Sequence, residues 1–357
     1  MSDKQVYRQY RGRAAGSNRV SRYSEYTRDV YLDVNALTDR ESVRTCVLTD
    51  HARTIITRNR SPDVPFERSI NPYQGCEHGC IYCFARPTHA WLDLSPGLDF
   101  ESRIFARSEA PDLLAREFSR PAYRPAVIAL GANTDAYQPI ERKLGITRRL
   151  LEVFRQFRHP LVIITKSVLL ERDLELLADL ARDNLVQVMV SVTTPDAELS
   201  RRMEPRAALP ARRVQMIRKL SEAGIPVGVL FAPVIPVLND HAMETVLGRC
   251  ADAGAQTAGY VMLRLPLELK ELFTNWLHEF YPLSADHVMH RIRDLHHGRE
   301  YEAQFGTRMT GSGHYADLIG QRFKLACRKL GLATTPVCLD CSLFSHSRTG
   351  CSQLDLF

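Results

Sequence analysis

The stretch Cys76–Cys83, CEHGCIYC, holds three cysteines in the spacing C-x3-C-x2-C. Thiolates this close together suit an iron–sulfur cluster or zinc, because both take tetrahedral sulfur ligation. A structural zinc site needs four ligands, whereas a four-iron four-sulfur cluster held by three cysteines leaves one iron open to a ligand. The favoured interpretation is a cluster on Cys76, Cys80 and Cys83, and the alternative is zinc completed by His78, His89 or a distant cysteine.

Repeated strand and helix patterns surround these cysteines and determine the expected fold. Apolar β-branched runs alternate with helical patterns such as Leu174–Ala181, and Gly224 and Gly254 end helices just before new strands. Six alternating strand and helix units predict an α/β fold with a parallel sheet. Because the crossovers between parallel strands are right-handed, consecutive units without a chain reversal curl most naturally into an open barrel. We expect a partial (β/α)6 TIM-like open barrel, with a doubly wound sheet as the alternative, and functional groups at the carboxyl ends of the strands. The expected strands are Phe66–Tyr73, Ala126–Gly131, Leu161–Thr165, Leu185–Val192, Val227–Val234 and Gly259–Leu265.

The chain divides into four expected segments. These are a basic N-terminal extension (1–60), the core barrel (61–270), a C-terminal helical segment (271–335) and a Cys-containing tail (336–357). The basic excess is local, because Met1–Arg28 has seven Lys or Arg against two acids. With its interleaved tyrosines this arm is suited to a phosphate backbone and to stacking on bases, and the alternative is a solvated tail.

The composition excludes a membrane span and favours a cytoplasmic location. The longest nearly uncharged apolar stretch, Ile225–Leu238, contains three prolines and is shorter than the roughly 20 residues that a bilayer requires. The N-terminus lacks the apolar core of a signal peptide. Nine cysteines without a secretion signal indicate reduced thiols rather than a disulfide framework.

Several further motifs accompany the cysteines. They are NPYQGCEHGCIYCFARPTH (71–89), NTDAYQPIE (133–141), ITKS (164–167), SVTT (191–194), EPRAALPARR (204–213), APVIPVLND (232–240) and FGTRM (305–309). With the C-x3-C-x-aromatic-C spacing, they resemble the radical S-adenosylmethionine (SAM) superfamily, and within it the branch related to spore photoproduct lyase, the "DNA repair photolyase" branch. The resemblance spans roughly Arg60–Leu332.

The resemblance implies an enzyme that uses a 4Fe-4S cluster to cleave SAM reductively to a 5′-deoxyadenosyl radical, which abstracts hydrogen from a substrate. It implies a reductant such as flavodoxin or ferredoxin. It places Tyr82 near the adenine, Thr134 at the methionine amino group, Lys166 at the carboxylate and Ser191 at the ribose. For each residue the alternative is a local structural role, such as a helix cap, a turn hydroxyl or packing.

The resemblance leaves the substrate and the hydrogen-transfer residues unassigned. Spore photoproduct lyase has a hydrogen-donating cysteine where this chain has Asn133, so another group, such as a tyrosine or Cys250, would have to quench a product radical. The basic arm favours DNA or RNA as the substrate. The alternatives are radical SAM modification of a protein or small molecule, and a noncatalytic metal-binding module.

Other charged residues and cysteines carry open expectations. Glu204 and Arg206 either position a ligand or pair with each other, and Arg264, within the last expected strand, needs a substrate anion or an internal partner. The C-terminal cysteines either provide ligands for a second metal centre or bind no metal. They are Cys327, Cys338, Cys341 and Cys351.

Overall fold

The strands of the core are short apolar runs, and they assemble in the order in which they occur along the chain. The computed structural model describes residues 9–18, 21–23 and 43–346. In this part of the chain the main sheet has seven strands in the order β10-β9-β8-β7-β6-β3-β2. They are β2 Thr57–Arg58, β3 Arg68–Ile70, β6 Ile128–Leu130, β7 Leu161–Thr165, β8 Val186–Ser191, β9 Val227–Val234 and β10 Thr257–Met262.

Six of these strands are parallel, and β2 joins the edge of β3 in antiparallel orientation. Because β10 and β2 are the two edges and do not pair with each other, the sheet is an open barrel. This confirms the expected partial (β/α)6 arrangement. The last strand was expected to reach Leu265. It ends at Met262, just after a shift in its register against β9 between Tyr260 and Met262.

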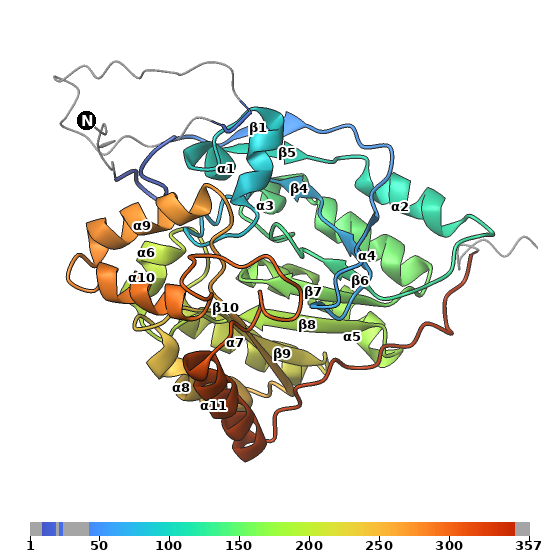
Figure 1. Cartoon of the computed structure of the whole chain (residues 1–357). Coiled ribbons are helices and arrows are strands. Elements are labelled where there is room, and N and C mark those ends of the chain that lie inside the picture. The colour runs from blue at the N-terminus through green and yellow to red at the C-terminus, as the bar shows by residue number, and fades with distance from the viewer. Residues whose placement is uncertain (1–8, 19–20, 24–42, 347–357) are drawn as a thin grey trace, which may run out of the picture.

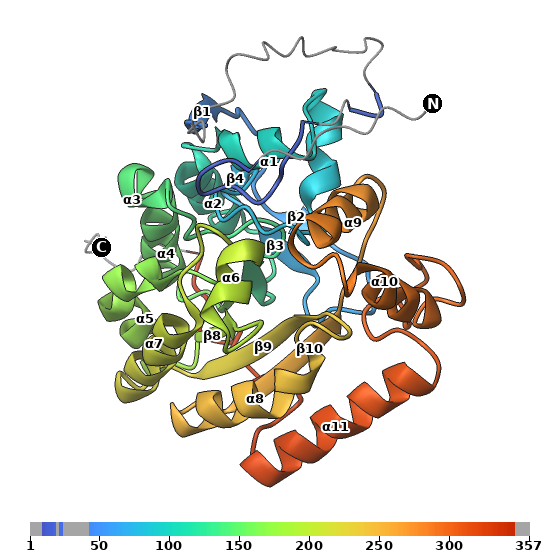
Figure 2. The same cartoon turned by 90° about the vertical axis from the view of Figure 1, so that its left-hand side faces the viewer.

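Amphipathic helices cover the outer face of the sheet (Figures 1 and 2). Each buries one apolar stripe, such as Leu176, Leu177 and Leu180 of α5. Gly224 and Gly254 follow two of these helices with φ of 73° and 99°, a conformation in which glycine has no steric penalty. The helices between the strands are α3 Glu141–Leu144, α4 Ile146–Gln156, α5 Leu174–Arg182, α6 Ala197–Met203, α7 Pro210–Glu222 and α8 Met243–Asp252, with 3-10 turns η3 Val168–Asp173 and η4 Asp240–Ala242.

A second, three-stranded sheet is separate from the main sheet, and the sequence patterns did not predict it. Its order is β1-β5-β4, from strands Cys46–Thr49, Arg103–Ala106 and Tyr73–Gln74. The flanking helices are η2 Arg86–Leu92, α1 Leu98–Ser102 and α2 Ala110–Phe118. Because β4 directly precedes Cys76, this sheet anchors one side of the cysteine loop.

The C-terminal part is helical, and its tail returns beneath the barrel (Figure 1). Helices α9 Leu269–Phe280, α10 Ala285–Asp294 and α11 His314–Leu330 follow β10. The tail then crosses the amino ends of the strands: Ala333 exchanges hydrogen bonds with the start of β10, the Asp340 amide donates to the Asn184 carbonyl, and Ser345 donates to Phe157. Across the described ranges, no helix combines the length and apolar character needed to cross a bilayer.

Candidate active site at the cysteine loop

Side-chain amide and carboxylate oxygens link the carboxyl ends of the first strands to one another. The Asn71 amide oxygen, just after β3, accepts from the Asn133 amide at 2.9 Å, which joins the ends of β3 and β6. Asp135 accepts from the Thr165 hydroxyl at 2.8 Å and from the Lys166 amide at 2.7 Å, which joins β6 to β7. Residues from three strands therefore form one continuous rim.

The three cysteines of the loop lie at this rim. Cys76 and Cys80 are 6% and 8% exposed, and Cys83 is half-buried. Turn hydrogen bonds from Gly79 to Cys76 and from Cys83 to Cys80 wind the loop around them. Burial raises the pKa of each thiol, and neighbouring thiols raise it further for Cys76 and Cys80. Such a set of thiols ionises readily only beside added positive charge, as a metal cluster provides.

The described residues contain no set of three or more His, Cys, Asp and Glu side chains already arranged to hold a metal ion. The histidines considered for zinc have other surroundings. His78 Nδ1 is 3.5 Å from Asp135 Oδ2, and burial lowers the pKa of His78 to about 4. His89 Nε2 contacts the Arg103 carbonyl at 3.0 Å, with the ring packed edge-on to Phe100. The local donor set therefore remains three thiols, which fits a cluster with an open iron better than a closed zinc site.

Arg86 supports the loop from beneath, and its side chain is fully buried. Its Nε and Nη2 donate to the carbonyls of Cys80 at 2.9 Å and Gly79 at 3.0 Å, and Nη1 donates to the carbonyls of residues 96 and 97. A further Nη2 bond of 2.5 Å reaches the buried carboxylate of Glu101. These bonds use all five donors of the guanidinium, so Arg86 holds the Gly79–Cys80 part of the loop.

Glu101 links the same loop to the N-terminal segment. Its carboxylate accepts from the amides of Ala14 at 3.1 Å and Ala15 at 2.9 Å. Gly79 has φ of 67°, and a Cβ there would lie 2.7 Å from Glu101 Oε2. Only glycine satisfies both the conformation and the close approach, which gives the glycine of CEHGC a structural reason.

Gln138 holds the other side of Cys76. Its Nε2 donates to the Gly75 carbonyl at 3.1 Å and its Oε1 accepts from the Glu77 amide at 2.9 Å. The side chain is fully buried. It therefore fixes the backbone on both sides of the first cysteine.

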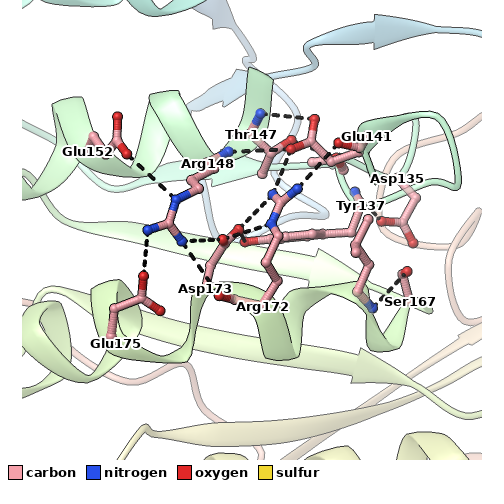
Figure 3. A network of polar contacts seen from close by, with 12 residues as sticks. Asp135, Tyr137, Glu141, Thr147, Arg148, Glu152, Ser167, Arg172, Asp173 and Glu175 are labelled. Atoms are coloured by element: carbon pink, nitrogen blue, oxygen red, sulfur yellow. Dashed lines mark hydrogen bonds and ion pairs between the residues drawn. The ribbon is translucent and has the colours of Figure 1, made fainter. Parts of the chain in front are cut away.

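A network of buried charged residues lies close to Gln138 (Figure 3). Glu141 and Asp173 are fully buried, and Arg172 bridges them with contacts of 2.8 and 2.9 Å. The Tyr73 hydroxyl, at the start of the cysteine loop, donates to Glu141, and the Tyr137 hydroxyl donates to Asp173 at 3.1 Å. The network therefore fixes the segments just before Cys76 and just before Gln138.

The residues predicted to contact SAM lie on the same rim. The Thr134 hydroxyl donates to the Tyr73 carbonyl at 2.6 Å, so its oxygen can still accept a hydrogen bond. Lys166 Nζ forms no ion pair with any described residue and lies 5.8 Å from the centre of the Tyr82 ring. The buried Ser191 ends β8, and its carbonyl accepts from Arg213 at 2.9 Å.

Glu204 and Arg206 do not pair with each other. The Glu204 carboxylate forms a fully buried ion pair with Arg213 and accepts from the Tyr82 hydroxyl. Burial raises the pKa of Glu204, against the effect of Arg213. Arg206 instead contacts Glu77 at 3.1 Å. Glu204 therefore positions Tyr82 and the end of β8.

Arg264 and the basic arm also differ from expectation. Arg264 follows β10 rather than lying within it, with its guanidinium 5.1 Å from the centre of the Phe84 ring. In the arm, the buried Arg13 donates to the Val43 carbonyl at 2.8 Å, and Arg22 pairs with Glu268 at 2.7 Å. These two arginines are engaged within the protein. The arm's remaining basic residues, apart from Arg11, lie outside the described residues.

Four other described cysteines lie on the outer helices and on the tail. Cys250, on α8, and Cys327, on α11, are buried in the helix-covered core. Cys338 and Cys341 lie on the returning tail, and Cys351 lies outside the described residues. Cys250 is therefore not placed to quench a radical at the cysteine loop.

Sequence reasoning missed three supporting residues, Arg86, Glu101 and Gln138. Two of them stand inside quoted motifs, as FARPTH and NTDAYQPIE. A polar side chain close in sequence to a metal-binding motif is the signal that could have identified them. Loops that carry metal ligands need hydrogen-bond partners outside the ligand set to hold them in place. Glu101 had no such signal, since it lies 15 residues beyond Arg86.

Comparison with known proteins identifies relatives at the levels of sequence and fold. The family model "Radical SAM superfamily" matches residues 70–250. An uncharacterized protein of Mycobacterium tuberculosis (strain H37Rv) is 36% identical over 240 residues, 67% of this chain and 69% of the relative. An uncharacterized protein of Methanocaldococcus jannaschii is 27% identical over 222 residues, 62% of this chain and 79% of the relative.

Among solved structures, spore photoproduct lyase complexed with dinucleoside spore photoproduct has a TM-score of 0.57, with 15% identity and 81% of each chain covered. A double mutant of that enzyme with bound AdoMet and the same ligand gives 0.58, with 16% identity and the same coverage. At these identities the similarity concerns the fold, and it agrees with the open barrel described above.

Proposed function

The chain belongs to the radical SAM superfamily, and we propose that Cys76, Cys80 and Cys83 hold a 4Fe-4S cluster with which it cleaves SAM and abstracts hydrogen from a nucleic acid. One observation carries the proposal: three thiols, two buried and one half-buried, share one loop at the carboxyl ends of the strands. When bound, the cluster and SAM supply the radical chemistry, with the electron coming from a reductant such as flavodoxin or ferredoxin.

The chain's own residues hold and orient these groups. Arg86 and Gln138 keep the cysteine loop in one conformation through hydrogen bonds to its backbone. We assign Lys166 to the carboxylate of SAM because its ammonium lacks an ion-pair partner among the described residues. Thr134 has a free acceptor position suited to the methionine ammonium.

The other two predicted contacts complete the proposed cofactor site. Tyr82, held by Glu204, is assigned to the adenine, and Ser191 to the ribose. The buried residues of the rim also limit the access of water. A carbon radical needs such exclusion of water to avoid side reactions. Asn133 provides no thiol at the point where spore photoproduct lyase has one, so we propose a reaction other than thymine-dimer reversal.

Nucleic acid is the proposed substrate class for two reasons. The chain has a net charge of +6 with its excess concentrated near the N-terminus. The fold is similar to that of an enzyme whose structure contains a dinucleoside spore photoproduct. Modification of a protein or small molecule is the alternative, and it predicts no salt-sensitive binding of DNA or RNA.

The test is anaerobic reconstitution with iron and sulfide, reduction with dithionite in the presence of SAM, and chromatography for 5′-deoxyadenosine. Wild type is compared with the triple alanine variant of Cys76, Cys80 and Cys83. A matched control removes three thiols outside the loop, those of Cys46, Cys338 and Cys341. We expect about four irons per chain and product in wild type and in the control, with neither in the loop variant. A wild-type protein that binds the cluster but forms no product contradicts the proposal.

A further inference from the structure

A strongly cationic pocket lies along β2, the edge strand that borders the opening of the barrel. Its cavity has a volume of about 270 Å³. The wall comes from the segment before β2, from β2 and β3, from α2 and from the turn after α2. Its charged residues are Arg53, Arg58, Arg68, Arg116, Arg120 and Glu117.

The charges in this pocket are poorly compensated. Glu117, the single acid of the lining, pairs with Arg120 at 2.6 Å. Arg53, Arg58 and Arg116 are exposed and form no ion pair with any described residue. Gathering three unpaired guanidinium groups around one cavity is unfavourable through like-charge repulsion, so the arrangement indicates a site for an anion.

The remaining arginine of the lining, Arg68, is held in place by its contacts. Arg68 Nη1 donates to the Arg124 carbonyl at 2.6 Å, and its guanidinium lies 5.1 Å from the centre of the Tyr123 ring. The register places Arg58 directly opposite Arg68 across the β2–β3 pair. Two arginines of the pocket are therefore positioned by a strand ladder rather than by a loop.

We propose that this pocket binds phosphate groups, and that it holds the sugar–phosphate backbone of the nucleic acid substrate. The planar guanidinium forms paired hydrogen bonds with phosphate oxygens. Apolar residues and the Tyr123 ring complete the lining, which suits a nucleotide better than a bare inorganic ion. The choice of a nucleic acid as the source of the phosphates rests on the proposed function. The phosphate site itself rests only on the charges and the cavity.

The pocket lies at the edge of the main sheet, where Arg68 begins β3. Since β2 is an edge strand, a backbone bound along it lies beside the lateral opening of the barrel. The two engaged arginines of the N-terminal arm, Arg13 and Arg22, do not provide this contact, because they are bonded within the protein. The pocket therefore replaces the described part of the arm as the expected backbone contact.

The experiment measures binding of a fluorescent single-stranded DNA or RNA oligonucleotide to the reconstituted protein by anisotropy, across a series of salt concentrations. The main variant changes Arg53, Arg58 and Arg116 to Gln. A matched control changes three exposed cations of α11, Lys324, Arg328 and Lys329, to Gln. The single variants Arg53→Gln and Arg116→Gln, on separate segments, guard against a folding defect. Binding of inorganic phosphate and of a mononucleotide is measured separately by isothermal titration calorimetry.

We expect the pocket variant to bind at least tenfold more weakly. The slope of log K against log salt should fall by about 2, since each single-strand phosphate contact contributes about 0.7. The control should bind as wild type does. Binding of phosphate and mononucleotide without binding of the oligonucleotide would support the site but assign it to a free phosphate compound. Equal binding by wild type and pocket variant, or no binding of any probe at low salt, would overturn the inference.

The proposed function is measured in the same samples as 5′-deoxyadenosine formed without substrate. The pocket variant should retain this activity, because the mutated residues lie outside the cysteine loop. If wild type forms no 5′-deoxyadenosine, the proposed radical chemistry is refuted, while the binding result can still be interpreted.

Discussion

Replacing Arg86 with Gln should destabilise the protein more than any substitution of a surface arginine. The variant leaves the Glu101 carboxylate buried without its cation and removes hydrogen bonds to the backbone of the cysteine loop. Breaking a buried ion pair by removing one partner costs about 3–5 kcal/mol. We therefore expect the free energy of unfolding to fall by about 4 kcal/mol, because both side chains are fully buried and the loop carbonyls also lose their donors.

The assay is denaturant unfolding followed by circular dichroism, with iron content measured after reconstitution. The matched control is Arg182→Gln, which breaks an ion pair with Asp179 whose arginine is 76% exposed. Such surface pairs contribute about 0–1 kcal/mol. Arg86→Lys keeps the charge but lacks the fork of donors, so it should recover only part of the loss. A cost for Arg86→Gln below about 1 kcal/mol, equal to that of the control, would refute the reasoning.

Two further predictions concern a loop glycine and a core histidine. Gly79→Ala should lower the free energy of unfolding clearly more than Gly145→Ala, because both glycines have positive φ but only a Cβ at Gly79 would meet Glu101, at 2.7 Å. The Gly145 variant should lose about 1 kcal/mol. Equal losses in the two variants would contradict the steric argument. Burial lowers the pKa of His159 to about 3, with its Nε2 2.9 Å from the Tyr123 hydroxyl. The unfolded chain binds this proton below about pH 6.5, so stability falls by about 1.4 kcal/mol per pH unit as the pH drops from there toward 3. His159→Gln should remove this contribution, and unfolding midpoints at pH 7 and pH 5 that shift equally in both proteins would exclude it.

The order and type of the core strands followed from the sequence because they depend on local patterns. Leu161–Thr165 and Val227–Val234 were predicted with the bounds that the structure has. A run of β-branched apolar residues favours a buried strand wherever the chain places it. The spacing of Cys76, Cys80 and Cys83 is also local, so the loop was identifiable as a metal-binding candidate without any knowledge of what packs against it.

Strand ends and short strands were less predictable. The edge strand β2 and the sheet of β1, β4 and β5 are two to four residues long and partly exposed. They have too few residues to show a period, and their pairing depends on segments that meet only after the barrel forms. The end of β10 likewise depends on its irregular pairing with β9.

The sequence by itself determined the barrel and the three thiols, whereas only the tertiary structure decided what holds and surrounds them. Gln138 reaches the cysteine loop across 61 positions of the chain, and Glu101 reaches the Ala15 amide across 86. The pocket gathers Arg53 and Arg120 from separate segments in the same way. Hydrophobic periodicity and cysteine spacing are properties of neighbouring residues, but a buried polar side chain is satisfied by whichever group the folded chain brings within about 3 Å.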